Sequence, residues 1–152
     1  MARLAQATAD RSSRDLETVL ADVTKAGLSP LVSPALLELA RLDLATGKPG
    51  DAAQRAQKAA AAAGPLQQRD LLFQARYLAG AALDKQGQRP AALEQYRQAL
   101  QPLEEMRSGL ANDALKAFLS RPETAAFGRD ADAAFRAAGG DERARLEKLL
   151  TP

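Results

Sequence analysis

The stretches TGKPGDAA (residues 46–53) and QGQRPAAL (residues 86–93) decide how this chain is expected to fold. In each of them a glycine that ends one helix precedes a proline that begins the next, and alanine-rich sequence lies on both sides. Two copies of one helix–turn–helix pattern indicate a repeat architecture. In such folds each hairpin buries its apolar face against the next, and binding occurs on the surface that the stack presents.

The composition favours helices along the whole chain. Apolar residues make up 46% of the sequence and are mostly alanine and leucine, whereas aromatic residues account for 4% and isoleucine is absent. Alanine, leucine, arginine, glutamine and glutamate are the strongest helix formers. A chain of 152 residues is also long enough for one domain with a core. We therefore expect an all-α fold, a single domain over residues 1–152, in which antiparallel helical hairpins stack as a superhelix.

The charge and hydropathy of the sequence argue against nucleic acids and membranes as partners. The 21 basic and 19 acidic residues are interspersed, and no basic stripe with interleaved aromatic residues is present, so we do not expect nucleic-acid binding. No segment approaches the roughly 18 to 20 apolar residues of a membrane span, and residues 1–7 lack the apolar region of a secretory signal. We expect a soluble cytoplasmic protein or a domain of a larger one. The absence of cysteine suits the cytoplasm and the periplasm equally.

Hydrophobic periodicity and Gly/Pro turns place the repeat hairpins within residues 13–104. Ser12 or Ser13 is expected to cap the first helix, and the next one is expected to begin at Ser29–Pro30 or at Ser33–Pro34.

Two further prolines are expected to mark helix boundaries. Pro65 is predicted to begin a helix that ends near Gly87. Pro102 interrupts an apolar pattern and is predicted to kink or end its helix near Leu100, because proline lacks the backbone N–H that continues a helix.

The second hairpin resembles the tetratricopeptide repeat. That family requires a small residue at the helix crossing, a large residue three later, a turn glycine, and then small, aromatic and small residues. Here these positions hold Gly80, Leu83, Gly87, Ala92, Tyr96 and Ala99. The small residues let two helix backbones approach, and the large ones fill the space beside the crossing.

The first hairpin matches the family less well. Ala56 stands where an aromatic residue is usual, and Asp43 where a bulky one is usual. Gly47 and Gly87 lie 40 residues apart (87 − 47), whereas the family's period is about 34. An unrelated alanine-rich helical bundle is the alternative.

The C-terminal helices, within residues 110–150, are expected to cap the last hairpin, with Phe127 and Phe135 pointing inward. Residues 115–122 are similar to segments that follow the last repeat in large bacterial signalling proteins, which carry kinase or ATPase domains. Covering the last apolar face is what an open stack of hairpins needs for solubility.

The sequence offers no recognisable catalytic chemistry. Histidine and cysteine are absent, so the commonest general base and the thiol nucleophile are missing. Asp130 and Asp132 lack the glycine and the distal glutamate of a calcium loop, and we interpret them as solvated helix residues. Residues 139–142, GGDE, spell the start of a cyclic-dinucleotide synthase motif, but they follow a helix, and we predict a helix stop there. We expect no enzymatic activity, no cofactor and no metal.

The resemblance implies a concave groove lined by the first helix of each hairpin. Carried over position by position, the partner-binding residues are Leu37, Arg41, Leu44 and Ala45 in the first hairpin and Gln74, Tyr77, Ala81, Asp84 and Lys85 in the second. The clamp that some family members use for a C-terminal carboxylate is not reproduced, because Ala81 stands where an asparagine is needed. Packing of Leu37 and Leu44 against the preceding helix is the alternative.

These observations lead to a non-catalytic protein–protein interaction module that binds a peptide or helix of a partner on a concave helical surface. The alternative is a regulatory or self-association region, able to form a homodimer, of a larger bacterial signalling enzyme such as a kinase or ATPase.

Overall fold

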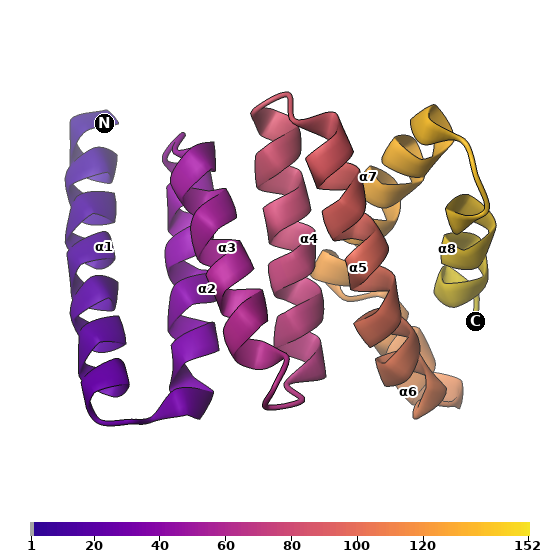
Figure 1. Ribbon diagram of the computed structural model, residues 1–152, viewed down its shortest axis with the longest axis horizontal. Coiled ribbons are helices and arrows are strands. Elements are labelled where there is room, and N and C mark those ends of the chain that lie inside the picture. Colours follow the sequence, from indigo (N-terminus) through magenta and orange to yellow (C-terminus); the bar gives the residue numbers. More distant parts are fainter. Residues whose placement is uncertain (1) are drawn as a thin grey trace.

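The computed structural model describes residues 2–152, over which the chain forms eight helices and no strand. Met1, part of the segment expected not to be a secretory signal, lies outside the described residues. The helices stand side by side in a row, with the two ends of the chain at opposite ends of it (Figure 1). They are α1 (Ala2–Lys25), α2 (Ser29–Ala45), α3 (Pro49–Ala63), α4 (Arg69–Lys85), α5 (Arg89–Ser108), α6 (Asn112–Leu119), α7 (Pro122–Ala138) and α8 (Glu142–Leu150). The prediction of an all-α stack of antiparallel hairpins is confirmed.

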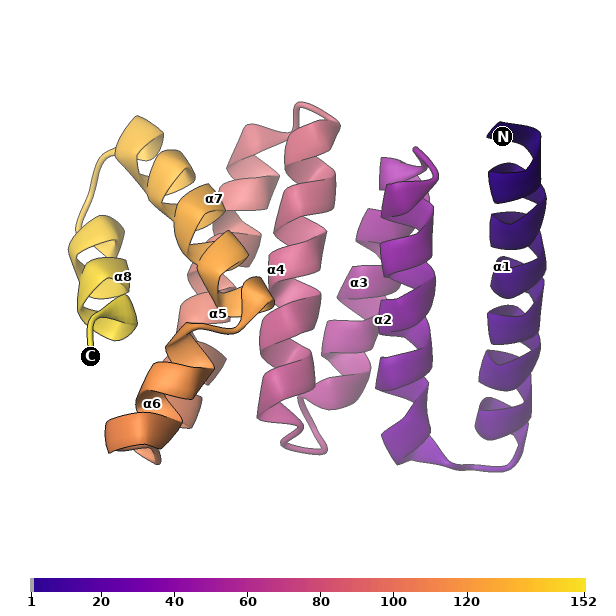
Figure 2. The same cartoon turned by 180° about the vertical axis from the view of Figure 1, so that it is seen from behind.

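The two hairpins are α2/α3 and α4/α5, and their turns have the same geometry. Gly47 and Gly87 adopt φ values of 77° and 74°, which glycine reaches without steric cost. In both turns the backbone N–H after the glycine bonds to the carbonyl five residues earlier, at 2.8 and 3.0 Å, which closes the end of the first helix. In Figure 2, α2 and α4 lie on one side of the stack with α7, and α3 and α5 lie on the other.

Small residues occupy the points where helices cross. Ala40, Ala56 and Ala79 are fully buried together where α2, α3 and α4 meet. In the second hairpin Gly80 lies beneath the ring of Tyr96, and a Cβ atom on Gly80 would lie 2.5 Å from Cε1 of that ring. The close approach predicted at Gly80 is therefore observed.

Two predicted helix starts are wrong. α1 runs without interruption through Ser12 and Ser13, because arginine, alanine and leucine around them favour helix more strongly than the serines favour a cap. The expected boundary at residue 13 therefore falls inside α1. Pro65 does not begin α4, which starts at Arg69, because Gln67 has a positive φ of 53° that breaks the helical path between them.

Two prolines lie inside helices. α2 begins at the first of its two predicted starts, so Pro34 is interior. The carbonyl of Pro30, which the missing amide of Pro34 leaves free, accepts a hydrogen bond from Nε2 of Gln68 at 2.9 Å. The predicted end of α5 at Pro102 is not observed, because the helix continues to Ser108 and buries Leu103 completely against the core; the alternative, a kink, stays a prediction.

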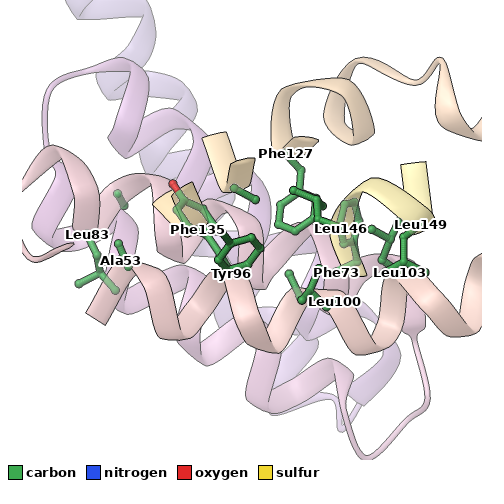
Figure 3. Close-up of a cluster of buried hydrophobic side chains, with 14 of the residues drawn as sticks. Ala53, Phe73, Leu83, Tyr96, Leu100, Leu103, Phe127, Phe135, Leu146 and Leu149 are labelled. Carbon is green, nitrogen blue, oxygen red and sulfur yellow. The ribbon is translucent and has the colours of Figure 1, made fainter. Parts of the chain in front are cut away.

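The C-terminal helices cover the second hairpin, as predicted. Phe127 and Phe135 of α7 are buried with leucines of α8 against Phe73, Tyr96 and the leucines of α5 (Figure 3). Ion pairs between elements fix this arrangement: Arg121–Asp70 at 3.0 Å, Arg97–Glu142 at 2.6 Å and Arg145–Glu104 at 2.6 Å. No helix within residues 2–152 is both long enough and apolar enough to cross a membrane.

A buried carboxylate connects the first three helices. Asp43 of α2 is almost fully buried and accepts a hydrogen bond from Nη1 of Arg55 on α3 at 2.9 Å. Nη2 of the same arginine donates to Oε1 of Glu17 on α1 at 2.6 Å. Burial raises the pKa of Asp43 above its ordinary value, against the opposing effect of the Arg55 charge.

Gly80→Ala tests the helix crossing. We expect a loss of about 1–2 kcal/mol in the free energy of unfolding, because the new methyl group collides with the immobile ring of Tyr96. Gly50→Ala in α3 is the matched control, since its Cβ would meet only a glutamine oxygen at 3.9 Å, and it should be neutral or stabilising by up to about 1 kcal/mol. Urea unfolding measures both, and equal effects would contradict the packing described.

Asp43→Asn tests the buried carboxylate through pH. Since the folded pKa of Asp43 lies above 3.8, the folded chain holds this proton where the unfolded chain has lost it. Its contribution to stability is therefore fully present below pH 3.8 and is lost as the pH rises through the folded pKa. We expect the stability of the wild type relative to Asp43→Asn to fall as the pH rises over that window, measured by urea unfolding. Exposed Asp113→Asn is the control, and a pH-independent difference for Asp43→Asn would refute this account.

Candidate functional site

The predicted groove residues differ in burial and in bonding partners. Arg41 of α2 donates hydrogen bonds to Glu38 on its own helix and to Oε1 of Gln74 on α4, so two of the predicted residues are brought together and bonded to each other. Leu44 is half-buried against the core, and Ala45 is exposed at the end of α2. This part of the predicted groove is a contact between two hairpins whose polar groups are already paired.

Leu37 is not a surface residue, and its assignment to the groove is wrong. Only 1% of it is exposed, and it packs with Leu36, Ala59 and Ala75. Leu20 of α1 packs against the same cluster. The alternative, in which Leu37 packs in the interior beside the preceding helix, is the observed one.

Tyr77 joins α4 to α7. Its hydroxyl donates to Oδ2 of Asp130 at 2.6 Å, and its ring lies edge-on to Phe127 with the centroids 5.7 Å apart. Burial, followed by the hydrogen bond to Asp130 and the charge of that carboxylate, raises the pKa of Tyr77 well above its usual range. Tyr77 is therefore a neutral, half-buried contact between two helices, and its predicted role in binding a partner stays a prediction.

A groove opens where α7 diverges from the first turns of α5, and we call it the α5/α7 groove. Its volume is about 650 Å³, within the usual range of about 300–1,000 Å³ for ligand sites. It lies between the beginning of α5 and the second half of α7. Its lining residues are Asp84, Arg89, Pro90, Ala92, Leu93, Tyr96, Asp130, Ala133, Ala134, Ala137 and Ala138.

The groove combines an apolar wall with a few polar groups. Alanines of α7 face Leu93 and Ala92 of α5, and the carboxylates of Asp84 and Asp130 lie among them. Arg89 is the basic residue of the lining. Of the predicted site residues, Asp84 lines this groove, whereas exposed Lys85 and half-buried Ala81 do not.

Sequence reasoning missed the contribution of α7. Asp130 was interpreted as a solvated residue, and the alanines after it were not assigned to a surface. The signal was available in the spacing of Ala133, Ala134 and Ala137, which places three small residues on one face of a helix. The sequence alone did not indicate that this face of α7 points towards α5.

The polar groups of the α5/α7 groove can hold a ligand in place. Among residues 2–152 no three acidic side chains gather closely enough to hold a metal ion. The polar groups of the α5/α7 groove are two carboxylates, a phenol and a guanidinium on an alanine-rich surface, which can orient a ligand through charge and hydrogen bonds.

Comparison of the sequence with models of known protein families gives no match, and comparison with characterised proteins gives none either. The tetratricopeptide resemblance therefore remains a prediction that rests on the residues of the second hairpin.

Proposed function

We propose that this chain is a non-catalytic interaction module that binds a peptide or helical segment of a partner protein in the α5/α7 groove. The main support for the proposal is the groove itself, which has a volume of about 650 Å³ and is lined largely by alanines between two helices. Because alanine side chains are short, the backbone of a bound segment can approach α7 closely. Helices that present such grooves bind amphipathic segments by their apolar face.

The groove is preformed, which favours binding by shape. α7 is held at its first residues by the pair Arg121–Asp70 and further along by the Tyr77–Asp130 hydrogen bond. Buried Phe127 fixes the same half of the helix to α4 through its edge contact with Phe73, at 5.1 Å between centroids. A rigid wall lowers the entropic cost of binding, so a few well-placed contacts suffice for affinity.

The hairpin arrangement supports a tetratricopeptide-like version of this proposal. α2, α4 and α7 lie on the same side of the stack (Figure 2), as the inner helices of such repeats would. In that version α7 takes the place of the first helix of a third repeat. The bonded pair Arg41–Gln74 would then form the margin of the surface, and the open space beside α7 its centre.

Ala133→Phe tests the groove as the binding site. Selection from a library of displayed helical peptides should enrich a common sequence on the wild-type chain. The added ring fills the groove, so we expect the affinity of that peptide to fall at least about tenfold, measured by fluorescence anisotropy. Ala117→Phe, at an exposed position of α6, is the matched control. Equal binding by both variants, or failure to enrich any peptide, would contradict the proposal.

Self-association is a second candidate, supported by the surface at the α1 end. Val19 of α1, Leu28 of the following turn and Leu31 of α2 are 48%, 47% and 49% exposed, and a contact with a second chain could bury them. In this version the chain is the assembly region of a larger signalling enzyme. The similarity of residues 115–122 to segments of large bacterial signalling proteins agrees with that role.

Sedimentation at several concentrations tests this second candidate. We expect a concentration-dependent dimer that Leu31→Lys abolishes, because a charge at the contact would have to be desolvated. Leu66→Lys, at an apolar residue 42% exposed in the loop before α4, is the control. A monomer at all concentrations would eliminate self-association as a function of this chain.

A further inference from the structure

The carboxylates of the α5/α7 groove form few hydrogen bonds and no ion pairs with described residues. The carboxylate of Asp84 makes no hydrogen bond or ion pair within residues 2–152. Asp130 uses its Oδ2 atom to accept from Tyr77, and no described residue bonds to its Oδ1 atom. Arg89 lies on the same rim but forms no ion pair with either carboxylate. The lining therefore has two acidic groups against one basic group, with carboxylate oxygens open to a ligand.

Tyr96 provides a second, independent indication of a ligand. This residue is only 1% exposed, yet its hydroxyl has no hydrogen-bond partner among the residues that the structure describes. It lines the groove, and its oxygen is not one of the fully enclosed polar atoms. The hydroxyl therefore opens onto the groove, where a ligand can bond to it without breaking any hydrogen bond within the protein.

The same hydroxyl lies within the field of both carboxylates. Burial raises the pKa of Tyr96, and the charges of Asp130 and Asp84 raise it further, so the phenol stays neutral. It can therefore accept a hydrogen bond from a cation while keeping its own proton. Asp84, Asp130 and Tyr96 together present three oxygen acceptors at one groove.

We propose that the partner segment bound in the α5/α7 groove carries a lysine or arginine whose cationic end lies between Asp84, Asp130 and the hydroxyl of Tyr96. This inference rests on the proposed function and names the chemistry of its partner. An ammonium group has three N–H donors and no acceptor, which matches the three acceptors. The apolar stem of the basic side chain would lie along Ala133 and Ala134, since such stems pack on apolar surface while their charge stays at a polar site.

Other ligand chemistries fit less well. An acidic segment would place its carboxylate in a groove that already holds two carboxylates, and like charges brought together repel. A metal ion would lack a third carboxylate, because no group of three acidic side chains gathers within the described part of the chain. A lone small cation would leave most of the 650 Å³ unfilled, which favours a side chain that belongs to a longer segment.

The test is a peptide selection carried out on four chains: wild type, Asp84→Asn, Asp130→Asn and, as a control for the loss of one charge elsewhere, Asp113→Asn. Asn at position 130 still accepts from Tyr77, so the position of α7 is preserved. We expect lysine or arginine to be enriched over glutamate at one position of the peptides bound by the wild type and by Asp113→Asn. This preference should weaken on Asp84→Asn and on Asp130→Asn.

Affinities of one selected peptide and its Lys→Gln derivative give the quantitative test. Fluorescence anisotropy should show about tenfold weaker binding for the derivative on the wild type, and a much smaller difference on Asp84→Asn. Tyr96→Phe should weaken the lysine peptide several-fold but leave the glutamine peptide unchanged, which a merely structural role of Tyr96 would not do.

The outcomes separate this inference from the proposed function. Failure to enrich any peptide overturns both. Enriched peptides without a basic position, or with one that persists equally on Asp84→Asn and Asp130→Asn, overturn the inference and leave the groove as a binding site. Enrichment of acidic residues would instead assign the recognition to Arg89.

Discussion

α4 and α5 can lie against each other only because residue 80 has no side chain. The ring of Tyr96 occupies the space in which a Cβ atom of Gly80 would stand. Held there, the ring stacks on Tyr77 with centroids 6.3 Å apart and meets Phe127 edge-on at 6.3 Å. These contacts position α7, and α7 forms one wall of the α5/α7 groove. The glycine at one helix crossing thus determines, through three aromatic rings, where a partner could bind.

In the first hairpin, different residues lie at the corresponding helix crossing. A shift of 40 residues relates Ala40 to Gly80 and Ala56 to Tyr96, so a pair of alanines stands where the second hairpin has glycine and tyrosine. Both pairs contain a small residue on the first helix, which lets the two helices approach closely. The same shift relates Asp43 to buried Leu83, and the acid is tolerated there because it bonds to Arg55. That arginine also reaches Glu17, so α1 is attached through a polar contact at this end of the stack.

Much of the fold was predictable because its signals are local. The glycine turns, the small residue at the crossing and the inward phenylalanines each follow from a residue type and its spacing. The errors came from longer-range effects. Pro102 stays within a helix because Leu103 beyond it is buried by tertiary contacts, and α4 starts late because Gln67 adopts a conformation that its residue type does not suggest. The position of Asp130 could not be foreseen, since its partner lies 53 residues earlier.

The opening of the α5/α7 groove follows from the uneven sizes of the side chains along α7. One face of the helix carries Phe127, Ala131 and Phe135, which are buried and pack it against the core. Another face carries Ala133, Ala134 and Ala137, whose short side chains line the groove with Leu93 of α5. The gap is therefore built into the packing and needs no moving loop to open it. Asp84, Asp130 and Tyr96 place polar atoms in a space that the chain's own side chains leave unfilled, and the best physical reason for such an arrangement is a molecule that fills it.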